Sequence, residues 1–297
     1  MQSSTVNRLI TDIKKHILPK GGLSYQRNGP YRVDATSWAI LALDAGGVNQ
    51  GIIQPLRMRL ASEQLPDGRL CILPDHPEAF WPTALAVLAW HGSADHLNST
   101  SRAIGFLLDT TGFHRDRTSD SPMGHDPSIK GWPWIADTHS WVEPTALSII
   151  ALQVTGHENH PRLLEARDML LDRQLPGGGW NYGNTSVFDK KLHPMPGPTG
   201  IAVQALINVV PQEHIAKSHR YLENTIVRVH TPLSLGWSLL GLSAWNKRPI
   251  DTHAHLRACV SRQERYGPYP SSQLCLLLLA SICENGLISH LRSKGSG

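Results

Sequence analysis

Residues 139–152 read HSWVEPTALSIIAL, a loop segment that leads into a short helix of apolar and small residues. Residues 77–90, PEAFWPTALAVLAW, repeat this arrangement closely. A helix that is apolar on nearly all sides is typical of a buried position. The chain is therefore built from a repeat that contains one buried helix. Four more copies occur at residues 29–43 (GPYRVDATSWAILAL), 194–207 (PMPGPTGIAVQALI), 229–242 (VHTPLSLGWSLLGL) and 266–279 (YGPYPSSQLCLLLL).

A proline is predicted to open the apolar helix in most copies. Proline suits the first helical position because its missing N–H has no partner there in any case, and because its φ angle is already helical. In the first copy Ala35 takes this place. The other five copies carry Pro82, Pro144, Pro198, Pro232 and Pro270.

More polar, amphipathic helices are predicted between the apolar ones, and each precedes its apolar partner. Because amphipathic helices lie outside buried ones, the alternation predicts two concentric rings. We expect an all-α fold, an (α/α)6 toroid of six outer–inner helix pairs around a central cavity. Residues 1–290 would form this single domain and residues 291–297 a C-terminal tail. An open solenoid of helix pairs is the alternative.

In such a ring every inner helix begins at the same end, which we call the mouth. Two long connections, residues 111–140 and 176–197, also lie at the mouth, whereas the connections at the other end are short. Long loops without secondary structure are usually functional. The mouth is therefore the predicted location of a site.

Composition narrows the classes of function. The chain has 297 residues, a net charge of +4 and no basic run, which gives no indication of nucleic-acid binding. Its four cysteines lack CxxC spacing, which favours reduced thiols and a cytoplasmic location. The most apolar segment, residues 274–282, is too short to span a membrane.

The repeats resemble those of the terpene cyclase and prenyltransferase superfamily, which is built on squalene-cyclase-type repeats. Residues 174–180, QLPGGGW, resemble the Gln…Gly-x-Trp repeat of triterpene cyclases, and residues 64–70, QLPDGRL, are a degenerate copy. The inner-helix segments resemble the family as well. The resemblance spans nearly the whole chain and implies the toroid fold more strongly than any particular activity.

The resemblance also implies candidate catalytic acids. In the family's cyclases a protonating Asp lies two residues before a Thr, and Asp34-Ala35-Thr36 and Glu143-Pro144-Thr145 keep this spacing. The full cyclase motif is absent, because Arg32 and Ala35 occupy its other acidic positions. Asp34 is also a good helix N-cap, whereas Glu is a poor one, so a structural role explains Glu143 less well.

Asp137, His139 and Glu143 lie in one short segment flanked by tryptophans. Aromatic surroundings favour the neutral, proton-donating form of a carboxyl group, and a nearby His could tune or relay its proton. Aromatic faces can also stabilise a carbocation. We therefore predict Glu143 or Asp34 as the acid, with His139 and Asp137 assisting. The predicted substrate-binding residues are Trp38, Trp81, Trp134, Trp141, Trp180 and Tyr182. Core packing is the alternative for the tryptophans.

The leading hypothesis is an acid-initiated cyclisation or isomerisation of an apolar, polyprenyl-type substrate, without a cofactor. A zinc or magnesium site is conceivable around Asp137 and His139, but no spacing supports one. The alternatives are a non-catalytic toroid subunit that binds a lipid or a partner protein, and a carbohydrate-active toroid with two carboxylates. Peripheral contact with a membrane surface, or with a partner subunit, is also expected.

Overall fold

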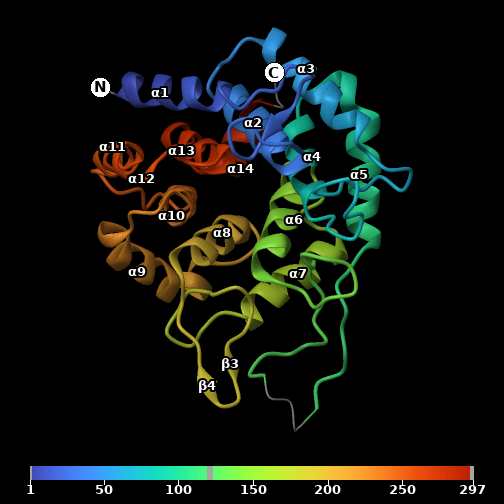
Figure 1. Cartoon of the computed structure of the whole chain (residues 1–297). Coiled ribbons are helices and arrows are strands. Elements are labelled where there is room, and N and C mark those ends of the chain that lie inside the picture. Colours follow the sequence, from blue (N-terminus) through green and yellow to red (C-terminus); the bar gives the residue numbers. More distant parts are fainter. Residues whose placement is uncertain (1, 119–122, 295–297) are drawn as a thin grey trace.

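Twelve helices alternate between an outer and an inner ring in the computed structural model, which describes residues 2–118 and 123–294 (Figure 1). The inner ring consists of α2 (Val33–Ala45), α4 (Pro82–Trp90), α6 (Val142–Val154), α8 (Pro196–Leu206), α10 (Pro232–Ala244) and α13 (Ser271–Ile282). The outer ring consists of α1 (Gln2–Lys14), α3 (Gln50–Ser62), α5 (Leu97–Asp109), α7 (Pro161–Asp172), α9 (Ala216–Thr225) and α11 (Thr252–Ser261). The predicted toroid is confirmed.

Shorter elements complete the chain. The helix α12 (Gln263–Tyr266) follows α11, and α14 (Leu287–Lys294) ends the described part. Two small hairpins pair β1 (Leu23–Ser24) with β2 (Tyr31–Arg32) and β3 (Ser186–Val187) with β4 (Lys190–Lys191). The 3-10 turns are η1 (Ala94–His96), η2 (Gln212–Ile215) and η3 (Ile226–Arg228).

The proline positions need a small correction. Pro82 and Pro232 are the first residues of α4 and α10 as predicted. Pro144 and Pro198 are third residues, and Pro270 is the residue before α13. All of these places lie where a helical N–H has no partner within the helix, so the physical reason for proline is unchanged.

A buried threonine in the first turn fixes the loop before each of the first four inner helices. The threonine hydroxyl accepts a hydrogen bond of 2.9 Å from the backbone N–H of a loop residue. Where that loop residue is Trp132 or Trp180, its indole N–H donates to a carbonyl of the preceding outer helix. This contact explains the Gly-x-Trp repeat as a link between the two rings. The four pairs are Leu23–Thr36, Leu70–Thr83, Trp132–Thr145 and Trp180–Thr199.

The ring closes between its last and first repeats. The N–H of Ser271, at the start of α13, donates to the carbonyl of Tyr25 at 2.9 Å. The Ser271 hydroxyl donates to the carbonyl of Ser24, in β1, at 2.8 Å. Because these bonds join residues almost 250 positions apart, the helix pairs form a closed ring, and the open solenoid is excluded.

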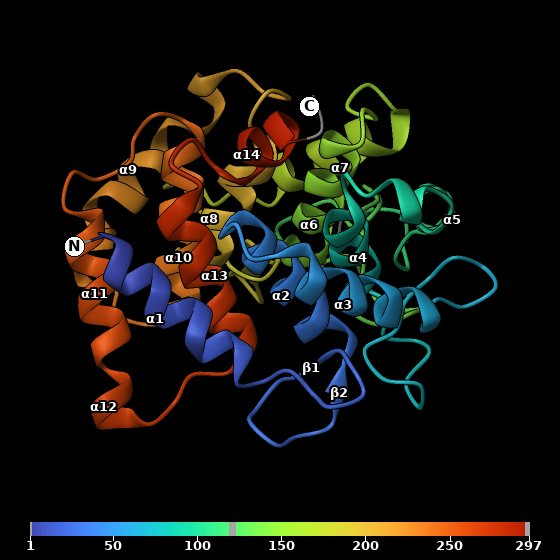
Figure 2. The same ribbon diagram turned by 90° about the horizontal axis from the view of Figure 1, so that it is seen from above.

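The helix α14 covers the end of the ring opposite the mouth (Figure 2). Its residues contact the C-terminal ends of inner helices: the Leu287 N–H donates to Gln204 Oε1 at 3.0 Å, and Arg292 Nη2 donates to the Gln153 carbonyl at 2.6 Å. Leu291 is also buried. The predicted boundary after residue 290 is therefore wrong, because it falls inside this packed helix. Of the predicted tail, residues 295–297 lie outside the described residues.

Side chains fill the centre of the ring beyond the mouth. All nine residues of α4 and every residue of α6 from Pro144 onward are buried. A space large enough for water would leave accessible surface on the side chains around it, so this burial indicates close packing. Trp38 and Trp237 meet edge to face there, with ring centroids 5.7 Å apart. The centre between these inner helices is thus packed, in contrast to the expected central cavity.

Within the described residues, no single helix is long and apolar enough to cross a bilayer. The α13–α14 pair has the necessary length and composition together, but the two helices are bent by 77°. The four cysteines are buried free thiols.

Candidate functional site

The two long loops pack against each other at the mouth, on the α7–α8 side of the ring (Figure 1). A β-bridge joins Met123 to Val187. Arg162, on α7, holds the first loop: its Nη2 donates to the Gly131 carbonyl at 2.6 Å, and its guanidinium lies 3.8 Å from the Trp132 ring centroid. Such charge-assisted and cation–π contacts fix a loop in one position.

Glu143 lies in the first turn of α6, at the floor of the mouth. Its side chain keeps some accessible surface but is surrounded by protein, and this burial raises its pKa to about 7 from an ordinary value of 4.5. A helix N-terminus favours the charged carboxylate by only about 0.3–1 kcal/mol, whereas each pKa unit corresponds to about 1.4 kcal/mol. Burial therefore outweighs the helix dipole.

No charged neighbour contributes to this shift in the pKa of Glu143, because burial is its only cause. Among the described residues Glu143 also has no hydrogen bond or ion pair. A carboxyl group with this pKa and no partner is about half protonated at neutral pH, and its proton is not engaged by another side chain. This is the state that a general acid requires.

Asp34, at the equivalent position of α2, has a different environment. Its two carboxylate oxygens accept hydrogen bonds from Arg32 Nε and Nη2 at 2.8 and 3.0 Å. This bidentate pair satisfies an acceptor and presents no proton to a ligand. Of the two acids that the sequence left open, only Asp34 is engaged by an arginine within the described residues, and the arginine two residues before it is the signal that distinguishes them.

The predicted aromatic residues fall into two groups. Trp81 and Trp134 are partly exposed and pack edge to face, with centroids 5.1 Å apart, and Trp141 is partly exposed at the start of α6. Tyr182 is 45% exposed on the second loop. In contrast, Trp180 is fully buried and Trp38 is 7% exposed inside the packed centre. The prediction of Trp180 as a substrate-binding residue is therefore wrong, because the residue joins the two rings.

His139 and Asp137 line a separate pocket of about 410 Å³, which we call the loop pocket. Trp141, the residue before α6, contacts His139 of this pocket: the centroids of the two rings are 4.3 Å apart. Neither His139 nor Asp137 is among the causes of the raised pKa of Glu143. The lining residues of the loop pocket are Phe113, His114, Arg115, Met123, His125, Pro127, Asp137, Thr138, His139, Ser140 and Arg173.

The sequence did not single out Arg173, which follows α7 and is 2% exposed in its side chain. Its Nη1 donates to the Gly183 carbonyl at 2.8 Å, so the guanidinium connects α7 to the second loop. Burial lowers the pKa of Arg173 to about 10, which leaves it charged at neutral pH. No local sequence pattern predicts this position, because the loop pocket forms only when the first long loop folds against the end of α7.

The described residues contain no group of three or more His, Cys, Asp or Glu side chains arranged to hold a metal ion. The Asp137–His139 pair that suggested a metal is therefore not joined by a third ligand within residues 2–118 and 123–294.

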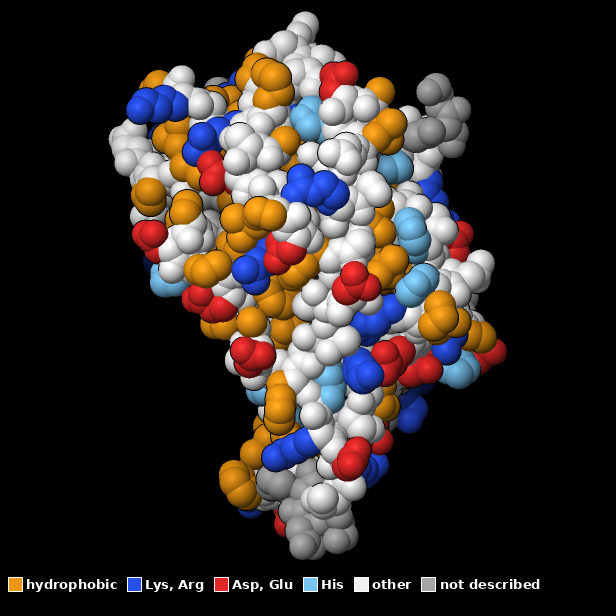
Figure 3. Space-filling view, turned by 90° about the vertical axis from the view of Figure 1, so that its right-hand side faces the viewer, with side chains coloured by type: hydrophobic (Ala, Val, Ile, Leu, Met, Phe, Trp, Pro, Cys, Tyr) orange, Lys and Arg blue, Asp and Glu red, His pale blue; other side chains and the backbone are white. Residues whose placement is uncertain are grey.

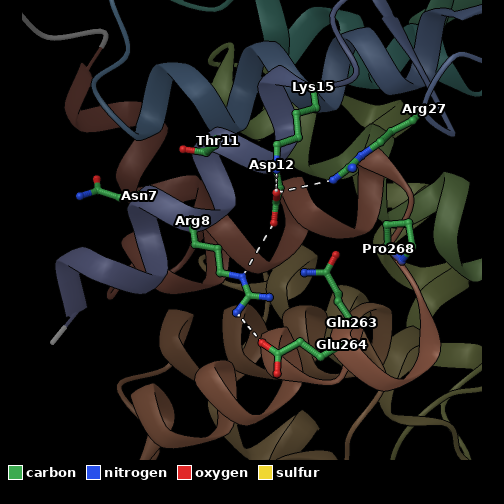
Figure 4. Close-up of a pocket in the computed structure, with 9 residues that line it drawn as sticks. All are labelled: Asn7, Arg8, Thr11, Asp12, Lys15, Arg27, Gln263, Glu264 and Pro268. Atoms are coloured by element: carbon green, nitrogen blue, oxygen red, sulfur yellow. Dashed lines mark hydrogen bonds and ion pairs between the residues drawn. The ribbon is translucent and has the colours of Figure 1, made fainter.

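A second groove, of about 520 Å³, lies between α1 and the α12 segment (Figure 4). Its charged side chains are paired with each other: Asp12 lies 2.7 Å from Lys15 and 3.6 Å from Arg27, and Arg8 lies 3.1 Å from Glu264. These contacts join the first and last repeats and leave the charges largely compensated. On the face that Figure 3 shows, positive and negative side chains are also interspersed.

Solved structures similar to this chain include enzymes of two chemical classes. The α-1,6-mannanase GH76A from Salegentibacter sp. has a TM-score of 0.65 at 10% identity over 95% of this chain and 98% of its own. A variant of the type II terpene cyclase MstE from Scytonema, in complex with its substrate geranylgeranyl dihydroxybenzoate, has a TM-score of 0.56 at 12% identity over 98% of this chain and 97% of its own. The fold is an α/α toroid. At these identities the similarity concerns the fold alone.

A third similar structure, the ent-copalyl diphosphate synthase from Streptomyces platensis, has a TM-score of 0.51 at 16% identity over 88% of this chain and 50% of its own. No protein-family model matches the sequence, and no curated protein matches it. The comparisons therefore show the α/α-toroid fold, which occurs in enzymes of both chemical classes.

Proposed function

We propose that the protein is an acid-initiated isoprenoid cyclase or isomerase in which Glu143 protonates an alkene or epoxide of an apolar substrate. The observation that supports this most is the state of Glu143, a carboxyl group with a pKa of about 7 and no charged neighbour acting on it. Proton transfer from such a group to carbon starts a carbocation reaction, and the carboxylate that results can take a proton back at the end.

The aromatic residues around the mouth have a role in this proposal. Trp141 directly precedes α6, and Trp81, which packs on Trp134, directly precedes α4; the partly exposed indoles of all three offer π faces at the mouth. Such faces attract cationic centres through their quadrupoles. Because the centre of the ring is packed, the reacting end of the substrate would bind at the mouth, and a longer chain would extend along the loops.

Carbohydrate hydrolysis is the second candidate, favoured by the similarity to the mannanase over 95% of this chain. Glycoside hydrolases generally use two carboxyl groups about 5–10 Å apart. Two such groups influence each other's pKa values, whereas no acidic group affects the pKa of Glu143. Asp34, the other acid of an inner-helix first turn, is engaged by Arg32.

Replacement of Glu143 by Gln is expected to lower turnover of a polyprenyl substrate by a factor of about 10² or more, because the amide cannot donate a comparable proton. Turnover would be measured by mass spectrometry on a panel of polyprenyl alcohols, epoxides and diphosphates, with Glu143→Asp and the exposed-site variant Glu213→Gln as controls. Hydrolysis of α-1,6-mannan measured in parallel would favour the second candidate. Equal turnover of a substrate by the wild type and Glu143→Gln would reject Glu143 as the acid. No turnover of any panel substrate or of mannan by the wild type would favour a non-catalytic, lipid- or partner-binding toroid.

A further inference from the structure

Two buried polar side chains of the loop pocket each have a nitrogen without a hydrogen bond among the described residues. His125 is 2% exposed, and its Nδ1 has no hydrogen bond. Arg173 is equally buried; its Nε has no hydrogen bond among the described residues and forms only an ion pair with Asp172 Oδ2, 3.6 Å away. A buried polar group without a partner costs about 1–3 kcal/mol. His125 Nδ1 and Arg173 Nε line one pocket without hydrogen bonds, and this indicates a ligand that would accept from them.

Asp172 forms an ion pair with Arg173, but Asp172 and Asp126 also accept hydrogen bonds from loop residues. Asp172 Oδ2 accepts a hydrogen bond from the Asp126 N–H at 2.9 Å, and Asp126 Oδ1 accepts from the Ser128 N–H and hydroxyl at 2.9 and 2.7 Å. Asp137 lines the pocket, but it is exposed at the rim. The charge of Arg173 is therefore only partly compensated inside the pocket.

Arg115 supplies a second cationic side chain to the pocket and is exposed on the first long loop. Burial, and then the charges of Arg173 and Arg115, lower the pKa of His139, and burial followed by Arg173 lowers the pKa of His125 to about 3. Both imidazoles are thus neutral at pH 7. Each can donate one N–H, while the positive potential of the pocket comes from the two arginines.

The opposite wall of the loop pocket is fixed by a chain of hydrogen bonds. His114 Nδ1 lies 3.1 Å from the Pro127 carbonyl, which assigns the proton to this nitrogen. His114 Nε2 then accepts from the Ser140 hydroxyl at 3.2 Å, and Ser140 Oγ accepts from the Gly131 N–H at 3.0 Å. The pocket is therefore formed before any ligand binds.

We propose that the loop pocket binds an oxyanion, either a phosphate or a carboxylate group, with Arg173 and His125 donating from its floor and Arg115 from its rim. Donors that are charged or preorganised in this way recognise planar or tetrahedral oxyanions. Trp141 contacts His139 on the side of the pocket and precedes Glu143 by two residues. We infer further, and this part rests on the proposed function, that the oxyanion is the head group of the substrate whose other end meets Glu143.

Isothermal titration calorimetry with inorganic phosphate, pyrophosphate and citrate tests the oxyanion site and distinguishes phosphate from carboxylate. Arg115→Ala is expected to weaken binding of the preferred anion at least about tenfold, because a hydrogen bond to a charged group contributes about 1.5–3 kcal/mol. Arg117→Ala removes the same charge from the same loop at a residue outside the pocket lining, and it should change the affinity less than about twofold. Circular dichroism would confirm that both variants are folded.

Two results would overturn the oxyanion site: no heat of binding with any of the three anions, or equal weakening by Arg115→Ala and Arg117→Ala. His125→Phe provides a second variant, which removes a buried donor and should also weaken binding if it folds. Glu143→Gln separates this proposal from the proposed function, because it should bind the anion as the wild type does. If the protein binds the anion and Glu143→Gln has unchanged turnover, the oxyanion site is retained and Glu143 is rejected as the acid. If turnover depends on Glu143 but no anion binds, Glu143 is retained as the acid and the oxyanion site is rejected.

Discussion

Gly200→Ala is expected to destabilise the ring by about 3 kcal/mol or more, because the added methyl group has no space. A Cβ at Gly200, in α8, would lie 2.4 Å from the backbone C and O atoms of Trp237 in α10. Gly241 makes the same contact from the other side, since its Cβ would lie 2.5 Å from the Gly200 carbonyl oxygen. Backbone atoms cannot rotate away as a side chain can, so the two helices would have to separate.

Gly105→Ala is the matched control for this substitution. Gly105 lies in the outer helix α5, and a Cβ there would meet nothing within 4 Å. Alanine is the better helix former by about 1 kcal/mol, so this variant should be as stable as the wild type or more stable. Chemical denaturation measures both free energies of unfolding. Equal stability of the two variants would contradict the close contact between α8 and α10.

Glu143→Gln is expected to be more stable than the wild type above neutral pH, by up to about 3 kcal/mol. Because burial raises the pKa of Glu143 to about 7 in the folded protein, the unfolded chain loses this proton first as the pH rises. The free energy of unfolding of the wild type should therefore fall between pH 4.5 and 7, and then stay level with respect to this group. The neutral amide of Gln does not titrate and lacks this loss.

The measurement for this prediction is the difference in free energy of unfolding between Glu143→Gln and the wild type at pH 5 and at pH 8. The difference should be several times larger at pH 8. Glu213→Gln, at an exposed site, should differ little from the wild type in free energy of unfolding at both pH 5 and pH 8. A Glu143→Gln variant that is less stable than the wild type at pH 8 would show that the charged carboxylate has a partner.

The sequence predicted the ring correctly because the repeat carries its own physical reasons. Apolar helices such as residues 82–90 have no polar side to expose, and the polar helices between them can only lie outside. The ring closure through Ser271 and the threonine contacts of the first turns have no such pattern, since each joins segments that become neighbours only after folding.

The candidate site was predicted in part. Glu143 could be identified because its position in the repeat offers it no capping role. The packing of the ring centre could not be identified from the sequence, because the side chains of Trp38 and Trp237 fill this space only once α2 and α10 face each other. The separation of His139 from Glu143 depends on the backbone near Asp137, which has a left-handed φ of 60°. Such a turn at a residue other than glycine is uncommon, and here it helps to place His139 in the loop pocket.

The protonation state of Glu143 is the basis of this account, and its pKa is the most direct measurement. Carboxyl carbon chemical shifts of ¹³C-labelled protein, recorded from pH 4 to 9 and assigned by comparison with Glu143→Gln, would follow this one group. The structure predicts a midpoint near 7. A midpoint near the ordinary value of 4.5 would contradict the assignment of Glu143 as a neutral, proton-donating acid.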